Sequence, residues 1–262
     1  MIFIDQLSKE IEIKYPPKRI ISLVPSQTEL LFDLGLNEEI VGVTKFCIHP
    51  KDKVKQATKI GGTKKLDIDK IRQLKPDLII GNKEENQKED IELLMQEFPV
   101  WMSDIYNLED ALNMILGIGA LVCKKAEAKF IIDDIENSFS NLLLSIKNKP
   151  RKKAAYFIWK APNMLAGSNT YINEMLKYCG LQNIVEQQRY PSFTTDELLN
   201  LQPEVVLLSS EPYPFTQKHV LAYKNIWPNA KVELVDGEMF SWYGSRLKLA
   251  ANYFKQLNSN LF

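Results

Sequence analysis

The chain has 262 residues, of which 45% are hydrophobic, and this is enough to bury the core of one large domain or of two smaller ones. Lys and Arg together number 33, as do Asp and Glu, so no overall charge draws the protein to nucleic acid or to an anionic membrane. No run of about 18 apolar residues occurs, and the N-terminus lacks the apolar core of a signal peptide. We therefore expect a protein without a membrane span, cytoplasmic as given, that binds a small molecule or another protein.

Predicted strands and helices alternate through the first half of the chain. Arg19–Val24 is a short apolar run typical of a buried strand, and the capping box from Ser26 to Glu29 predicts that a helix begins there and ends at Gly35. Further strands are predicted at Ile11–Ile13, Ile40–Val43, Asp77–Ile80 and Val100–Met102, and helices at Asp67–Leu74 and Gln87–Glu97. This alternation indicates a parallel sheet covered on both faces, which forms an N-terminal α/β lobe over residues 14–122.

The longest predicted helix runs over Cys123–Lys147, near the middle of the chain. Apolar residues recur along it at steps of three and four, and Pro150 ends the pattern. The two lysines of its first turn stand where the helix dipole disfavours cations, so a start near Glu127 is an alternative. About 25 helical residues reach about 37 Å, and we predict a spine over residues 123–148 that joins two lobes. The other interpretation is an ordinary long helix packed on one sheet.

The alternation resumes after the spine and predicts a second α/β lobe over residues 149–262. Strands are predicted at Ala154–Trp159, Val205–Ser209 and Lys231–Val235, and helices at Thr170–Tyr178, after the capping box Thr194–Glu197, and at Ser245–Leu257. An internal repeat relates the two lobes, because the segment from Asp69 to Ile80 corresponds, at a shift of 127, to the segment from Asp196 to Leu207.

No motif indicates catalysis. The chain has only two histidines and lacks a GxSxG motif, a glycine-rich phosphate loop and an HExxH motif, so we predict no catalytic residue, no metal site and no cofactor. Cys47 and His49 leave two interpretations open. In the first, the two residues act chemically, as a nucleophile with its base or as a pair of soft metal ligands. In the second, they are a buried thiol and a polar histidine near the mouth of a cleft. Burial is expected for all three cysteines.

Aromatic residues gather on the loops that follow predicted strands, where open α/β sheets bind ligands. Single aromatic side chains usually belong to a core, but a set of them on loops indicates a ligand cleft. The candidate ligand-binding residues are Ser26, Phe46, His49, Trp159, Tyr190, Phe193, Trp242 and Tyr243.

Several motifs together resemble one family. They are Arg19–Glu29, Val41–Thr44, Ile60–Gly62 and Leu74–Ile80, combined with a mid-chain spine. The chain resembles the class III substrate-binding proteins of ABC importers, the helical-backbone receptors for cobalamin and ferric siderophores, and within this group the vitamin B12 binders. The resemblance implies a non-enzymatic, monomeric receptor that holds a corrinoid in a cleft between two lobes and docks on an ABC permease if exported. The family is periplasmic or displayed at the cell surface. The alternatives are a ferric-siderophore or haem receptor of the same family, and a cytosolic metal or corrinoid chaperone using Cys47 and His49.

The resemblance also implies a role for acidic residues beyond the repeated strand. In that family one acidic residue on the outer surface of each lobe docks to arginines of the permease. Glu84 or Glu85, and Glu211, stand in the matching segments, and the repeat carries Glu84 onto Glu211. We expect these side chains to face outward and to form charge-assisted pairs with the permease. The other interpretation is that exposed loops hold glutamates by chance.

Overall fold

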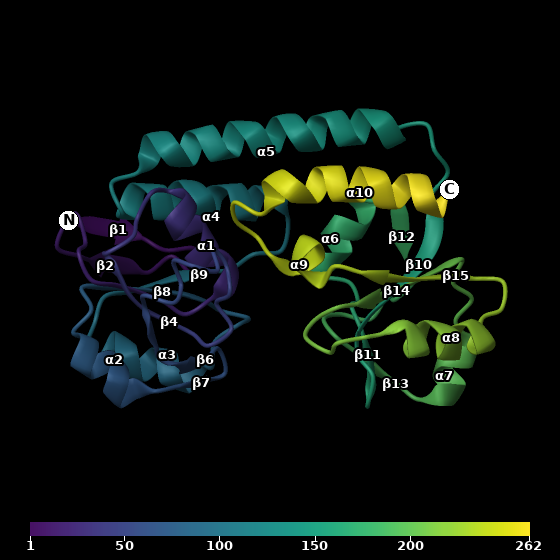
Figure 1. The fold of residues 1–262 in the computed structure, drawn as a ribbon, viewed down its shortest axis with the longest axis horizontal. Coiled ribbons are helices and arrows are strands. Elements are labelled where there is room, and N and C mark those ends of the chain that lie inside the picture. Colours follow the sequence, from purple (N-terminus) through teal and green to yellow (C-terminus); the bar gives the residue numbers. More distant parts are fainter. The chain divides into compact units, whose positions relative to one another are not determined.

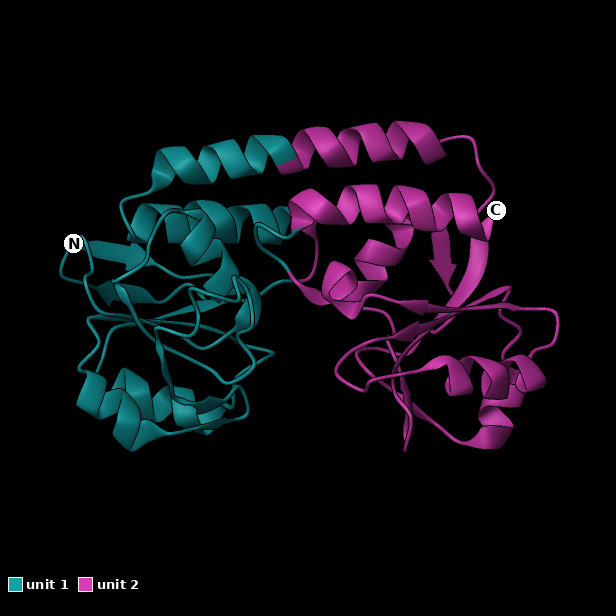
Figure 2. Ribbon diagram, in the orientation of Figure 1, with its two compact units in different colours: residues 1–105, 109–134, 243–246 teal, residues 106–108, 135–242, 247–262 magenta.

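A computed structural model describes residues 1–262, which fold into two compact α/β units (Figures 1 and 2). Unit 1 contains residues 1–105, 109–134 and 243–246, and unit 2 contains residues 106–108, 135–242 and 247–262. The predicted fold class, two lobes built on parallel-dominated sheets, is confirmed. The predicted boundaries at residues 122 and 149 stay a prediction. None of the helices is long and apolar enough to cross a membrane.

The central sheet of unit 1 has five strands, all parallel, in the order β5-β4-β3-β8-β9. Its strands are β3 (Ile20–Ser22), β4 (Ile40–Val43), β5 (Thr58–Lys59), β8 (Leu78–Asn82) and β9 (Val100–Ser103). Two antiparallel pairs flank it, β1 (Ile2–Ile4) with β2 (Glu10–Glu12), and β6 (Gly61–Gly62) with β7 (Lys65–Leu66). Every residue of β3, β8 and β9 is buried, as expected for parallel strands covered on both faces.

Helices cover both faces of this sheet, with α2 and α3 below it and α4 above it in Figure 1. The helices of unit 1 are α1 (Pro25–Asp33), α2 (Ile68–Leu74), α3 (Lys88–Met95) and α4 (Leu108–Leu121). The predicted capping box at Ser26 was wrong. The helix begins one residue earlier at Pro25, and Val24 caps it without a side-chain hydrogen bond. Proline needs no N–H partner and its fixed φ suits the first helical position, so the serine is not required as a cap.

Helix α5 (Lys125–Ile146) is the predicted spine, and it is one continuous helix. Its buried stripe consists of Ala128, Ile131, Ile135, Phe139, Leu142 and Ile146. Residues up to Asp134 belong to unit 1 and residues from Ile135 belong to unit 2 (Figure 2). The interpretation as an ordinary helix packed on one sheet was therefore wrong.

Unit 2 holds a six-stranded sheet in the order β13-β11-β10-β14-β15, with β12 paired to β10. Strands β10, β12, β14 and β15 pair in parallel, whereas β11 and β13 add an antiparallel edge that was not predicted. The strands are β10 (Lys152–Trp159), β11 (Asn163–Leu165), β12 (Leu181–Asn183), β13 (Ser192–Phe193), β14 (Val205–Ser209) and β15 (Lys231–Val235). The helices are α6 (Tyr171–Tyr178), α7 (Thr195–Asn200), α8 (Gln217–Ile226), α9 (Gly237–Ser241) and α10 (Leu247–Leu261).

The internal repeat is visible in the structure. Strands β8 and β14 have the same length, and a short helix precedes each of them. Strand β8 pairs with β3, and β14 pairs with β10. The carboxylate of Asp77, just before β8, accepts the backbone N–H of Arg19 at 2.8 Å. Its counterpart Glu204, just before β14, accepts the N–H of Lys153 at 2.8 Å. Each carboxylate thus ties the start of the repeated strand to the start of its neighbour.

A short segment, Tyr243–Arg246, returns to unit 1 and packs on α1. A Cβ atom on Gly244 would lie 3.0 Å from the carbonyl oxygen of Ser26, so the approach of the two backbones requires a glycine. Arg246 Nε and Nη2 donate to the carboxylate of Glu29 at 2.8 and 2.6 Å. Both side chains are largely buried, with exposures of 9% and 14%. The pair is therefore a desolvated, bidentate anchor within unit 1.

We expect Arg246→Ala to lower the free energy of unfolding of unit 1 by about 3 to 5 kcal/mol, because it leaves the Glu29 carboxylate buried without its partner. The measurement is urea unfolding followed by circular dichroism. The matched control is Arg72→Ala, which removes an arginine bound to Glu97 and Asp69 at the surface of the same unit and should lower the free energy of unfolding much less, because solvent screens exposed ion pairs. Equal losses in the two variants would contradict the anchor.

Candidate functional site

The candidate residues follow the carboxyl ends of parallel strands, where open α/β sheets bind ligands. In unit 1, β3 leads into Ser26 on α1, and β4 leads into the loop that carries Phe46 and His49. In unit 2, β10 ends at Trp159. The structure therefore places four of the eight candidates at this edge of one sheet or the other.

Trp159 heads a cluster of aromatic rings in unit 2. Its side chain is 39% exposed, and its ring meets the Tyr213 ring edge-on at a centroid distance of 5.5 Å. Tyr213 in turn contacts Phe215 at 4.8 Å and His219 at 5.6 Å. The indole N–H of Trp159 donates to the carbonyl oxygen of Ala161 at 3.1 Å, which fixes the ring's orientation. The cluster thus presents an exposed aromatic ring of fixed orientation that packs on rings behind it.

Tyr213 is one of the aromatic residues on loops after predicted strands but was not among the candidate contacts, and His219 was not predicted as part of this surface. The signal for Tyr213 was its position two residues after the repeated glutamate. His219 is buried, and its Nδ1 accepts the N–H of Thr216 at 2.8 Å, closing a capping box at the start of α8. Burial, with the charges of Lys160 and Lys218 nearby, lowers the pKa of His219 below its ordinary value. The fold therefore favours the neutral imidazole.

A second group in unit 2 combines an arginine with two tyrosines. The guanidinium of Arg189 lies 5.6 Å from the ring centre of Tyr190 and 5.9 Å from that of Tyr106. Its Nη1 donates to the carbonyl oxygen of Asn169 at 3.0 Å. Tyr190 is partly exposed, so this candidate keeps a face that a ligand can reach. Arg189 was not predicted, although it directly precedes Tyr190 in the sequence.

The loop after β4 contains an exposed ring and a buried thiol. Phe46 is 51% exposed, and the Lys45 ammonium lies 5.0 Å from its ring centre. Cys47 Sγ lies 3.1 Å from Thr28 Oγ1, and burial raises the pKa of the thiol. No group of three or more His, Cys, Asp or Glu side chains is placed to hold a metal ion. The interpretation of Cys47 as a nucleophile or metal ligand is therefore disfavoured, since both need the thiolate.

Several other expectations about burial need correction. Phe193 lies in the hydrophobic core of unit 2 at 8% exposure, packed among buried aliphatic and aromatic side chains, so it presents little surface to a ligand. Ser26, Trp242 and Tyr243 are buried at 4%, 7% and 6% exposure and present little surface to a ligand. Cys123, expected to be buried, is exposed in the turn between α4 and α5. Some of the candidate aromatic residues are thus buried and others are exposed, and the sequence alone did not distinguish the two groups.

Glu211 does not face outward, contrary to expectation. Its carboxylate is partly buried and accepts hydrogen bonds from Ser241 Oγ at 2.8 Å and from Trp242 Nε1 at 3.0 Å. Burial raises the pKa of this carboxyl group. Glu84 and Glu85 are partly exposed, and Asn82 Oδ1 accepts both of their backbone N–H groups, at 2.9 and 3.1 Å. The two repeated positions therefore differ in their environment.

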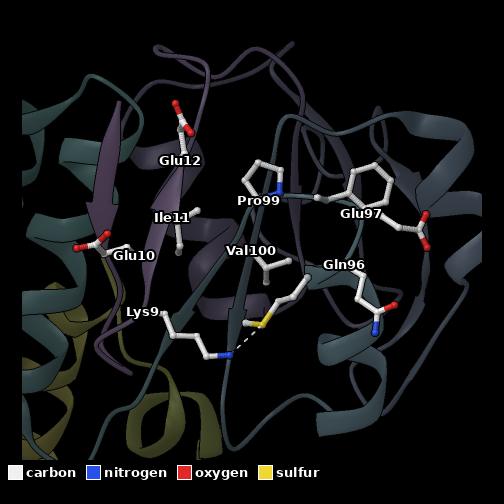
Figure 3. Close-up of a pocket in the computed structure, with 10 residues that line it drawn as sticks. Lys9, Glu10, Ile11, Glu12, Gln96, Glu97, Pro99 and Val100 are labelled. Carbon is white, nitrogen blue, oxygen red and sulfur yellow. Dashed lines mark hydrogen bonds between the residues drawn. The ribbon is translucent and has the colours of Figure 1, made fainter.

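One pocket lies away from these residues. It has a volume of about 450 Å³ and lies between β2, the end of α3 and the start of β9 (Figure 3). The Lys9 ammonium reaches across to Met95 Sδ at 3.3 Å. Because Pro99 and Val100 stand at the amino end of β9, this pocket is at the edge of the sheet opposite to the candidate site.

Comparison with known proteins gives a consistent result. The family model described as "Periplasmic binding protein" matches residues 20–222. A vitamin B12-binding protein of Vibrio parahaemolyticus is 23% identical over 222 residues, which cover 84% of this chain and 78% of that protein. An uncharacterised ABC transporter substrate-binding lipoprotein, YvrC, of Bacillus subtilis is 26% identical over 214 residues, covering 78% and 67%. The crystal structure of the periplasmic vitamin B12 binding protein BtuF of Vibrio cholerae aligns with a TM-score of 0.82 and 20% identity, covering 94% of this chain and 98% of that one.

We expect the stability of unit 2 to fall as the pH drops below about 6.5, the ordinary pKa of histidine. The pKa of His219 is lowered in the folded protein, so the unfolded chain binds this proton more readily and the stabilisation is complete only above the unfolded pKa. The measurement is the thermal unfolding midpoint at pH 7.5, 6 and 5 for the wild type and for His219→Gln. Glutamine can accept the Thr216 N–H but does not titrate, so the variant should lose part of the pH dependence. An unchanged pH dependence would show that His219 does not cause it.

Proposed function

Because the chain belongs to the periplasmic binding protein family, whose members are solute-binding proteins rather than enzymes, we propose that its ligand is a corrinoid of the vitamin B12 type. The general role, substrate binding for an ABC importer with a small-molecule ligand and a permease partner, follows from the family. The identity of the ligand as a corrinoid is the proposal, and the likeness to vitamin B12-binding proteins supports it.

The observation that carries the proposal is the exposed aromatic surface at the carboxyl end of β10. A corrinoid is a large, flat, mostly apolar ligand that gains affinity by covering aromatic rings. Trp159 presents an indole whose orientation is held by the contacts to Tyr213 and Ala161. Ring pairs contribute about 0.5 to 1.5 kcal/mol beyond the burial of their area. Phe46 and His49 in unit 1, and Tyr190 in unit 2, are the remaining candidate contacts. The binding cleft between the lobes and the monomeric state stay predictions.

The alternatives differ in how well the side chains suit them. A haem or ferric siderophore is also a large chelate that aromatic rings can cover, so it remains the second candidate ligand. The metal chaperone using Cys47 and His49 has less support, because the Cys47 thiol is 2% exposed and hydrogen-bonded to threonine hydroxyls.

Calorimetry with cyanocobalamin, haemin, a ferric siderophore and zinc tests the ligand. We expect cyanocobalamin to bind, and Trp159→Ala to weaken the binding about tenfold through the loss of ring contact and buried area. The control is Phe130→Ala, which removes a ring that is 68% exposed on α5 and should leave the affinity unchanged. Binding of haemin or the siderophore without cyanocobalamin would favour the second candidate. Zinc binding alone would favour the chaperone.

We also propose that the protein docks on its permease through Glu84 and Glu85 and works, like its family, in the periplasm or as a lipoprotein. We expect Glu84→Lys with Glu85→Lys to reduce permease-dependent uptake severalfold, because the change replaces attraction by repulsion. Ligand affinity should not fall, because neither glutamate lines the candidate site. The control is Glu92→Lys on α3, an exposed glutamate of the same unit. Full uptake by the double variant would reject this docking site, and fractionation of the native protein tests the location.

A further inference from the structure

Unit 1 has a second, larger pocket at the edge of the sheet where the candidate residues lie. Its volume is about 880 Å³, and it is lined by Lys45 and Phe46 after β4, by the β6–β7 hairpin with Lys64 and Lys65, and by the start of α2. Lys45 and Phe46 follow the carboxyl end of β4 directly. The pocket therefore belongs to the ligand-binding edge of this sheet, unlike the pocket of Figure 3.

The charges in this pocket do not cancel. Lys45, Lys64 and Lys65 are all exposed, and no ion pair joins any of them to a carboxylate. Lys64 Nζ donates to the backbone carbonyl oxygen of Glu84, which is a neutral acceptor. Of the two aspartates that line the pocket, Asp67 pairs with Lys70 at 3.3 Å, and Asp69 pairs at 3.1 Å with Arg72, which also binds Glu97, so three lysines face two partly compensated carboxylates. The pocket therefore carries an excess of positive charge in a chain whose net charge is zero.

Close packing on a glycine holds the cation and the aromatic ring side by side. A Cβ atom on Gly62 would lie 3.1 Å from Phe46 Cε2 and 3.3 Å from Lys45 Cε, so any side chain there would require both neighbours to shift slightly outward. Gly61 has φ +94, a conformation that favours glycine and forms the start of the hairpin. The arrangement presents an ammonium group beside the exposed face of a ring.

We propose that this pocket binds an anionic substituent of the ligand, a carboxylate or a phosphate, while the Phe46 ring covers the apolar surface next to it. This inference rests on the proposed function and adds a specificity to it: within its ligand class the protein prefers members that carry a negative charge at the periphery. Several ammonium groups around one anion give charge-assisted hydrogen bonds, which are stronger than neutral ones. The phosphate of a corrinoid's nucleotide loop and the carboxylates of haem are the two chemical sources.

The test compares ligands that differ in this group. Calorimetry measures the affinities of cyanocobalamin, which carries a phosphate, of dicyanocobinamide, which lacks the nucleotide loop, and of haemin, which carries carboxylates. We expect the wild type to bind cyanocobalamin about tenfold more tightly than dicyanocobinamide. Lys45→Gln with Lys64→Gln and Lys65→Gln should abolish that preference and leave the affinity for dicyanocobinamide unchanged. A preference for haemin that the same variant abolishes would assign the carboxylate as the source.

The matched control is Lys51→Gln with Lys53→Gln and Lys55→Gln, which removes the same charge from a later part of the β4–β5 loop that does not line the pocket. This variant should keep the preference, and both variants should keep the thermal unfolding midpoint of the wild type. If the wild type binds its corrinoids equally and the pocket variant changes no affinity, anion binding in this pocket is rejected while the proposed function stands. If both triple variants lost the preference for cyanocobalamin to the same extent, anion binding in this pocket would also be rejected, because the result would indicate a long-range charge effect. No binding of any of the three ligands would overturn both.

Discussion

The parallel pairing of β3 with β8, and of β10 with β14, is the constraint on which the rest of each unit depends. Parallel strands must be joined by crossovers, so their carboxyl ends meet at one edge and their amino ends at the other. In both units a carboxylate secures the pairing at the amino end, Asp77 in one and Glu204 in the other. The loops at the carboxyl end are thereby free of this structural task. They carry the exposed rings of Phe46 and Trp159 and the lysines of the pocket in unit 1.

The same constraint explains how much of the fold the sequence could predict. Strands β4, β14 and β15 have the predicted bounds, because each is a short apolar run between turn residues and needs no distant information. The capping box at Thr194 is confirmed, with both reciprocal hydrogen bonds present. The similar motif at Ser26 failed since Pro25 supplied a local alternative start for the helix. The antiparallel strands β11 and β13 were missed because each is only two or three residues long.

The candidate site was less predictable than the fold, because burial is set by contacts between distant residues. Phe46 and Phe193 were both candidate ligand contacts, yet one is half exposed and the other lies in β13 and belongs to a core. The positive charge at Lys45, Lys64 and Lys65 was hidden in the sequence by the nearby aspartates. Only the structure reveals that Asp67 and Asp69 are already paired with Lys70 and Arg72 on their own helix. Composition gives the sum of charges, whereas recognition depends on which of them remain uncompensated.

The repeated glutamates show how two related segments diverge. The loops after β8 and β14 begin alike, since Asn82 and Ser209 each accept a backbone N–H from the residue two positions later. At Glu211 a partner from far along the chain intervenes: α9 and its following residue bring Ser241 and Trp242 onto the carboxylate. A charged group that is buried and already bonded gains little from a further cationic partner, because the bonds that it holds must first be broken. The repeat therefore transmits the backbone geometry of a loop but not the availability of the side chain that it carries.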